Sequence, residues 1–251
     1  MPRFAANISL LFQEYAFEDR FAAAARAGFK AVEILFPYDT PAMTLRRLLE
    51  QNELHLVLMN APPPVTSGKR GFPAATGEET VFRAVMKDVL AYGQTSRPDL
   101  VHVMAGYERG AQARENFVQN LKWLADIAPD RRFAIEPLND KDQPGYFLND
   151  YGLAMEVLSD VNRPNVGLQY DTYHAQMIQG DAIRIWEEYG AHAVHVQIGA
   201  APDRSEPGGS PVDFQTLFTM FDQSAYYGWV SAEYHPSTAR TEDSLDWMQL
   251  K

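Results

Sequence analysis

The stretch Val166-Gly-Leu-Gln-Tyr-Asp171-Thr-Tyr-His174 shows the pattern on which the fold prediction depends. A short, largely apolar run has the length of a buried strand and ends in a carboxylate, and a helical pattern marked by Ile183 and Trp186 follows it. Runs of the same kind recur at Phe4–Ile8, Ala31–Leu35, Leu54–Asn60, Leu100–Ala105, Phe133–Pro137, Ala193–Ile198 and Trp229–Tyr234. Eight strands at an average step of about 32 residues predict a chain of repeated strand–helix units.

Amphipathic stretches separate the predicted strands. The first is expected to end at Gly28, a residue typical of helix C-termini. The second is expected to begin at Thr40-Pro41, with the threonine as the cap and the proline in the first turn. A short last helix is expected around Leu245 and Met248.

Eight strands alternating with eight helices indicate an α/β fold, a single (β/α)8 TIM barrel that forms one domain over residues 1–251. An open doubly wound sheet is the alternative. Such sheets usually carry a glycine-rich fingerprint after the first strand, whereas residues 7–13 contain no glycine. We therefore expect no nucleotide cofactor.

Composition excludes several classes of protein. The 251 residues include 33 Asp plus Glu against 22 Lys plus Arg, a net charge of −11, which opposes binding to nucleic acid. There is no cysteine for a disulfide or thiolate site, and no apolar run long enough to span a membrane. The apolar run Phe4–Phe12 is interrupted by Asn7 and Ser9 and has no small-residue cleavage site after it, so we expect a cytoplasmic protein. The sequence leaves a homo-oligomeric state open.

Oxygen-bearing side chains recur at the carboxyl ends of four consecutive predicted strands, where the chemistry of a TIM barrel lies. They are Glu136, Asp171, Gln197 and Glu233. Side chains alternate along a strand, and the positions of the same parity hold small or polar residues, namely Ala134, Gly167, Gln169, His195 and Ser231. All four side chains are therefore expected to point into the barrel mouth.

Three carboxylates and one amide oxygen at one place would repel one another without a cation. Oxygen ligands in this number suit Mg²⁺ or Mn²⁺. Carboxylates in a partly desolvated mouth can also exchange protons near neutral pH. Each residue alone is equally compatible with a solvated group at a strand end, but the repetition on four strands favours a site.

Five motifs of the chain resemble the hydroxypyruvate isomerase family, which belongs to the xylose-isomerase-like TIM barrels. They are Glu136-Pro-Leu-Asn139, Asp171-Thr-Tyr-His174-Ala-Gln, His195-Val-Gln197-Ile, Pro202-Asp-Arg204-Ser-Glu206-Pro and Glu233-Tyr. The resemblance covers essentially the whole chain. It implies that Glu136 and Glu233 are paired acid/base residues, and that these two residues with Asp171 and Gln197 are the ligands of a divalent metal. It also places His174 and Arg204 near a small oxo-acid substrate.

Three histidine and arginine positions have a second interpretation. His174 is equally compatible with a histidine that packs in its loop, and His195 is expected to be a satisfied histidine of the core. The planar guanidinium of Arg204 is suited to bind a substrate carboxylate. The same side chain could instead form a salt bridge with Asp203 or Glu206 in its own loop.

The long segment Ala61–Glu78, rich in Pro, Gly, Ser and Thr, is predicted to be an active-site lid, with an ordinary surface insertion as the alternative. Its Lys69 and Arg70 are further candidates for binding the substrate carboxylate. Two arginines of the family pattern are absent from this chain. After Glu233-Tyr the family has Pro-Arg-Gly, whereas this chain has His235-Pro-Ser. In the lid the family has Pro-Gly-Arg, whereas this chain has Ala75-Thr-Gly. The exact substrate therefore stays open.

The residues suit the isomerisation of hydroxypyruvate to tartronate semialdehyde through an enediolate. The reaction removes a proton beside a carbonyl and returns one at the neighbouring carbon, which two carboxylates and a metal can perform. The four-carbon analogue, 2-oxo-tetronate, is an equally compatible substrate. A ketose 3-epimerase would use a similar site, whereas an endonuclease IV-like enzyme would need more histidines and a basic surface. A sugar-acid binding protein would need no paired glutamates.

Overall fold

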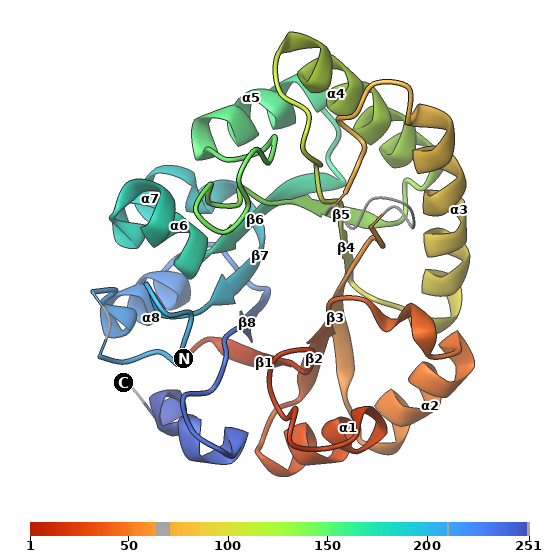
Figure 1. The fold of residues 1–251 in the computed structure, drawn as a ribbon. Helices are drawn as coiled ribbons and strands as arrows, with labels where there is room; N and C mark the ends of the chain where they lie inside the picture. The colour runs from red at the N-terminus through yellow and green to blue at the C-terminus, as the bar shows by residue number, and fades with distance from the viewer. Residues whose placement is uncertain (64–70, 210, 250–251) are drawn as a thin grey trace.

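The computed structural model describes residues 1–63, 71–209 and 211–249. Eight parallel strands follow one another around a closed barrel, in which β1 pairs with both β2 and β8. Their bounds are β1 Arg3–Asn7, β2 Ala31–Ile34, β3 His55–Asn60, β4 Leu100–His102, β5 Arg132–Ile135, β6 Val166–Asp171, β7 Ala193–Ile198 and β8 Trp229–Ala232. Figure 1 shows the helices arranged around these strands. The predicted (β/α)8 TIM barrel is confirmed.

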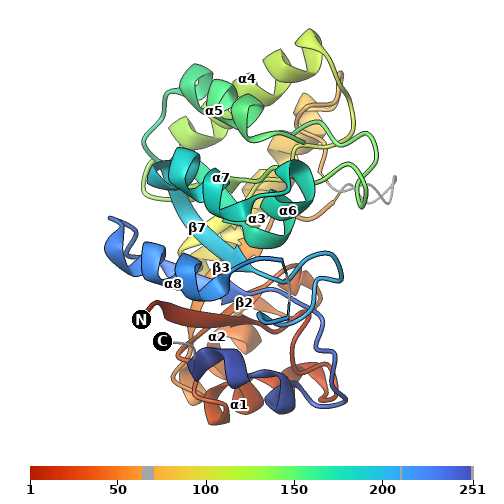
Figure 2. The same cartoon turned by 90° about the vertical axis from the view of Figure 1, so that its left-hand side faces the viewer.

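Helices connect the strands and cover the outside of the barrel (Figures 1 and 2). The α-helices are α1 Phe17–Arg26, α2 Ala42–Gln51, α3 Glu79–Ser96, α4 Ala111–Ile127, α5 Tyr151–Val161, α6 Thr172–Gln179, α7 Ala182–Tyr189 and α8 Phe214–Gln223. The 3₁₀ helices are η1 Pro37–Asp39, η2 Gly190–His192, η3 Thr241–Ser244 and η4 Asp246–Gln249. None of the described helices is both long and apolar enough to cross a membrane.

The expected regular alternation of strands and helices is wrong at β6 and β8. Two helices follow β6, because Asp171 ends the strand and its side chain accepts the Tyr173 N–H, which starts α6 at once. After β8, the short last helix expected around Leu245 and Met248 is present as two 3₁₀ turns, since η4 contains Met248 and Leu245 directly follows η3.

The expected start of α2 is also wrong in one detail. No side chain caps this helix, and Pro41 rather than Thr40 is its N-cap residue. Thr40 instead ends η1, where its backbone N–H donates to the Pro37 carbonyl. Gly28 does follow the end of α1 with φ +98°, as expected of a glycine beyond a helix C-terminus.

The barrel interior changes from apolar to polar along the strands. A small buried cluster comprises Ala5, Ala31, Val57, Leu58, Leu100 and Ala134. Ala134 lies two residues before Glu136, and Leu58 two residues before Asn60, so each apolar side chain shares the face of a buried polar one. A polar layer thus lies above an apolar one, toward the carboxyl ends of the strands.

The N-cap of α8 can be tested by its contribution to stability. The Asp213 carboxylate accepts the Thr216 N–H at 3.0 Å and the Thr216 hydroxyl at 2.7 Å. Replacing Asp213 with alanine removes both acceptors, so we expect the free energy of unfolding to fall by about 1 kcal/mol and the Tm by roughly 2–4 °C. Thermal unfolding followed by circular dichroism measures the change.

Asp88→Ala is the matched control, because Asp88 is exposed within α3. Alanine is the better helix former there, so this variant should keep or slightly raise the Tm. Equal losses in both variants would contradict the capping role of Asp213.

Candidate active site

The four oxygen-bearing side chains converge as the strand parity predicts. Glu136 and Glu233 lie directly after β5 and β8, Asp171 ends β6, and Gln197 lies in β7; each residue is at most 6 % exposed. Glu136, Gln197 and Glu233 line a small cavity of about 20 Å³ at the carboxyl end of the barrel. Asp171 is joined to the same cavity through Arg204.

Arg204 bridges two of the buried carboxylates. Its Nη2 lies 3.0 Å from Asp171 Oδ2 and 2.9 Å from Glu233 Oε1, and the guanidinium stacks over the Tyr173 ring at 5.0 Å. The alternative pairing inside its own loop is not found among the described residues. Glu206 instead accepts the backbone N–H of Ser237 at 3.0 Å. Arg204 is therefore part of the site.

Glu33 is a site residue that the sequence analysis missed. It lies in β2, is fully buried, and accepts three N–H groups: Asn7 Nδ2 at 2.7 Å, His195 Nε2 at 2.6 Å and Gln197 Nε2 at 2.5 Å. The available signal was a single acidic residue inside the apolar run Ala31–Leu35. Glu33 also explains His195, which is the satisfied core histidine that the sequence predicts.

Burial and like charges raise the pKa of the catalytic candidates. Burial raises the pKa of Glu136 well above its usual range, and the charges of Asp171 and Glu233 raise it further. Burial also raises the pKa of Glu233, against the opposing charge of Arg204, and the negative charges of Glu33 and Asp171 raise it further. The pKa of Asp171 is raised by burial and partly restored by Arg204.

Glu33 differs from the other three carboxyl groups. Burial alone would raise its pKa, but the charge of His195 and the hydrogen bonds from His195 and Gln197 outweigh burial and lower it. The site thus separates one carboxylate that stays ionised from carboxyl groups that hold protons more strongly. Such a separation is typical of sites that perform acid–base chemistry.

The donor set fits a hard divalent cation. Among the described residues, the buried atoms Glu136 Oε1 and Glu233 Oε2 have no hydrogen-bond partner. Ligand atoms of Glu136, Asp171 and His174 lie within 4.8 Å of one another. Surplus negative charge and unpaired buried oxygens are what Mg²⁺ or Mn²⁺ would satisfy. Gln197 reaches the same cavity, where its Oε1 accepts Gln169 Nε2 at 2.7 Å.

The proton position on His174 favours hydrogen bonding over metal binding. Its Nδ1 accepts the backbone N–H of Asn139 at 3.1 Å, so the neutral ring carries its proton on Nε2. That nitrogen lies 3.9 Å from Asp171 Oδ2, and the ring lines the cavity. Because a protonated nitrogen cannot ligate a metal, His174 is suited to donate a hydrogen bond to a bound ligand.

The predicted lid lies partly outside the described residues. Lys69 and Arg70 belong to the part that is not described, so their substrate-binding role stays a prediction. The following segment packs on the β4–α4 connection: Gly71 bridges to Ala105, and the Thr76 N–H donates to Glu108 at 2.7 Å. Gly71 has φ +76°, and a Cβ there would lie 1.9 Å from the Met104 carbonyl oxygen, which explains the need for glycine.

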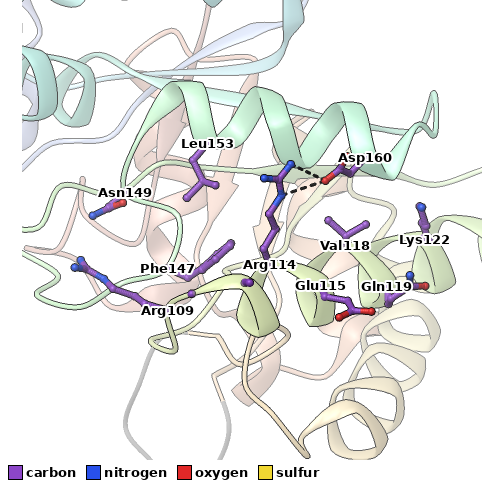
Figure 3. A pocket seen from close by; sticks show the side chains of 12 residues that line it. Arg109, Arg114, Glu115, Val118, Gln119, Lys122, Phe147, Asn149, Leu153 and Asp160 are labelled. Carbon is purple, nitrogen blue, oxygen red and sulfur yellow. Dashed lines mark hydrogen bonds and ion pairs between the residues drawn. The ribbon is translucent and has the colours of Figure 1, made fainter.

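A larger cavity, of about 650 Å³, lies between α4 and α5 outside the barrel (Figure 3). Its two arginines form ion pairs near the surface. Arg114 contacts Asp160 at 2.7 Å (Figure 3). Arg114 also contacts Glu156 at 2.6 Å, and Arg109 contacts Asp140. Arg109 is exposed and Arg114 is partly exposed, so neither is held in the desolvated setting that perturbs catalytic groups. The strand-end site is the better candidate despite its small volume.

Comparison with known proteins identifies the family. Residues 21–251 match the model of the xylose isomerase-like TIM barrel family, and the chain belongs to that family. It is 39 % identical to a 2-oxo-tetronate isomerase of Cupriavidus necator, over 99 % of this chain and 98 % of that protein. It is 34 % identical to a hydroxypyruvate isomerase of Escherichia coli, also over 99 % and 98 %.

A solved structure of a protein named AP endonuclease, family 2, from Brucella melitensis has 40 % identity and a TM-score of 0.95, covering 99 % of this chain and 98 % of that one. The resemblance predicted from the five motifs is confirmed by the named relatives. The chain is an enzyme of isomerase type.

Metal addition tests the donor set directly. We expect Mn²⁺ at about 100 times its Kd to stabilise protein first treated with EDTA by about 2.7 kcal/mol, raising the Tm by roughly 5–10 °C. Asp171→Asn should abolish most of this rise, because it removes a buried charged ligand. Differential scanning fluorimetry with and without Mn²⁺ measures both.

Asp160→Asn serves as the control, since Asp160 pairs with Arg114 in the outer cavity. It should leave the Mn²⁺-induced rise unchanged. An EDTA-treated wild-type protein whose Tm does not respond to Mn²⁺ or Mg²⁺ would exclude a working metal site.

Proposed function

We propose that the protein isomerises a short 2-oxo acid that carries a neighbouring hydroxyl group, either hydroxypyruvate or 2-oxo-tetronate. The observation that carries the proposal is the pair Glu136 and Glu233, two buried carboxyl groups with raised pKa values and unpaired oxygens on one small cavity. The identity of 39 % with a 2-oxo-tetronate isomerase makes the four-carbon acid the first substrate to test.

Each of the two glutamates performs one of the two proton transfers. One carboxylate removes the proton from the carbon beside the carbonyl, and the other group, protonated, delivers a proton to the neighbouring carbon. Their raised pKa values suit this exchange, because a group that titrates nearer to neutral pH accepts and donates protons more readily there.

Glu136, Asp171, Gln197 and Glu233 would hold the divalent metal. When bound, Mg²⁺ or Mn²⁺ would supply the positive charge that stabilises the negatively charged oxygens of the enediolate intermediate. The protein's own contribution is to hold the oxygen donors of four strands in a fixed arrangement. The site therefore needs little reorganisation to reach the transition state.

Arg204 and His174 would orient the substrate. Arg204 presents a planar guanidinium that can bind the substrate carboxylate through two parallel hydrogen bonds. His174 directs its Nε2–H toward the cavity, where it can donate to a substrate oxygen. Lys69 and Arg70 of the predicted lid are further candidates for the carboxylate.

A nuclease is the alternative suggested by the name of the Brucella melitensis protein. The net charge of −11 opposes it, because DNA binding depends on neutralising phosphates with Lys and Arg. A ketose 3-epimerase would use the same kind of paired carboxylates, so activity measurements must separate these reactions.

A panel of substrates tests the proposed function. We expect turnover of 2-oxo-tetronate or hydroxypyruvate in the presence of Mn²⁺, and none of D-fructose or of an oligonucleotide with an abasic site. Glu136→Gln and Glu233→Gln should each lower kcat by roughly 10²–10⁴-fold, the usual contribution of a positioned acid or base. Product formation is followed by chromatography.

Glu206→Gln is the matched control, because Glu206 binds Ser237 rather than the cavity groups. It should keep wild-type kcat. Turnover of the ketose or the DNA alone would overturn the proposal, and wild-type rates in Glu136→Gln or Glu233→Gln would remove the assigned roles.

Isotope labelling tests the proton-transfer mechanism. Substrate deuterated at the carbon that loses its proton should give product that has exchanged the label with water, because the proton delivered by one glutamate is not the proton removed by the other. Mass spectrometry of the product after a single turnover measures the label. Complete retention would indicate a hydride shift, and Glu136 and Glu233 would then be metal ligands only.

A further inference from the structure

We propose that Glu33 is a positioning residue that fixes the orientation of the Gln197 carboxamide, so that Gln197 presents its oxygen rather than its NH₂ group to the cation. This inference rests on the proposed function, because it concerns how one of the proposed metal ligands is oriented. Glu33 acts through Gln197, and it is not among the residues that line the cavity.

The position of Glu33 is fixed on two sides that do not involve Gln197. Asn7 Oδ1 accepts the backbone N–H of Ser9 at 3.0 Å, so the NH₂ group of Asn7 must face Glu33, where it donates at 2.7 Å. His195 Nε2 lies 2.6 Å from the other carboxylate oxygen. Full burial of all three side chains holds this arrangement in place.

Glu33 determines which end of the Gln197 amide faces it. Gln197 Nε2 lies 2.5 Å from Glu33 Oε1. A carboxylate that already accepts the N–H groups of Asn7 and His195 offers only acceptor oxygens, so a flipped Gln197 would bring two oxygens together at this distance. The flipped amide is therefore excluded.

The orientation of the Gln197 amide also fixes that of the Gln169 amide. Gln197 Oε1 accepts Gln169 Nε2 at 2.7 Å, and a carbonyl oxygen keeps a second lone pair for another partner. Gln169 lines the cavity, and its buried Oε1 has no hydrogen-bond partner among the described residues. Glu33 thus orients two amides in series so that acceptor oxygens are available at the cavity.

An anchor of this kind is needed because a carboxamide is almost symmetric in shape. Rotation by 180° exchanges an acceptor for a donor without any change in packing. With the NH₂ group turned toward the carboxyl cluster, Gln197 would repel a cation instead of binding it. A buried carboxylate can only accept hydrogen bonds, so it excludes the orientation in which the Gln197 oxygen faces Glu33.

A charge-exchange pair of variants tests the inference. In Glu33→Gln the new side chain offers both a donor and an acceptor, so Gln197 can flip, and we expect the Kd for Mn²⁺ to rise by about 10–100-fold. In the double variant Glu33→Gln/Gln197→Glu, the carboxylate at position 197 presents oxygen in either orientation, and the glutamine at position 33 donates to it. Most of the lost affinity should return.

The Kd values are measured from the electron paramagnetic resonance signal of free Mn²⁺, together with the Tm of each variant. Asn7→Ser is the matched control, because it removes the other donor to Glu33 Oε1 and leaves Gln197 anchored. It should lower the Tm but keep the wild-type Kd, which separates amide orientation from general loosening of the cluster.

Two results would overturn the inference alone: a wild-type Kd for Mn²⁺ in Glu33→Gln, or a double variant that binds Mn²⁺ no better than Glu33→Gln. A wild-type protein that binds no Mn²⁺ would overturn both the metal site of the proposed function and this inference. Gln197→Glu alone measures how much the added carboxylate charge strengthens Mn²⁺ binding. Recovery of affinity in the double variant supports the inference when it exceeds that gain, because a purely structural role of Glu33 predicts equal gains in both backgrounds.

Discussion

The burial of four carboxyl groups in one barrel mouth is the constraint on which the rest of the site depends. Desolvation makes each charge costly, so each needs a specific partner. Arg204 forms ion pairs with both Asp171 and Glu233, and Glu33 receives its hydrogen bonds from neighbouring N–H groups. Glu136 is the least compensated, since its nearest ion-pair partner is His102 at 3.7 Å. The surplus negative charge is therefore concentrated where an acid–base group or a metal ligand would be useful.

The barrel can hold this concentration of charge because its strands separate apolar from polar layers. On β5, Ala134 lies beneath Glu136, and on β6 Gly167 lies beneath Gln169. A Cβ at position 167 would lie 2.3 Å from the Val194 side chain, so glycine leaves room for packing at that level. The polar layer above can then be filled with side chains that hydrogen-bond to one another across neighbouring strands.

Regular features of the chain were predictable from the sequence, and contacts between distant segments were not. The period of two along each strand is a local property, so it placed Glu136 and Glu233 correctly on the cavity. Glu33 was missed because its partner His195 lies 162 residues away in the sequence, so no local pattern connects the two residues. The contacts of Arg204 depend on the conformation of a loop, which has no sequence period to reveal it.

The position of Arg204 would couple binding of the proposed cation to binding of the proposed substrate. A cavity of about 20 Å³ accommodates little more than one water-sized species, which occupies about 10–15 Å³ by the same measure, so a three- or four-carbon acid requires side chains to move. Arg204 is held by Asp171 and Glu233, the same two carboxylates that a divalent cation would neutralise. A bound cation would therefore weaken the attraction that holds the guanidinium in place and make it available to the substrate carboxylate. By linkage, a substrate that binds Arg204 would in turn favour the cation.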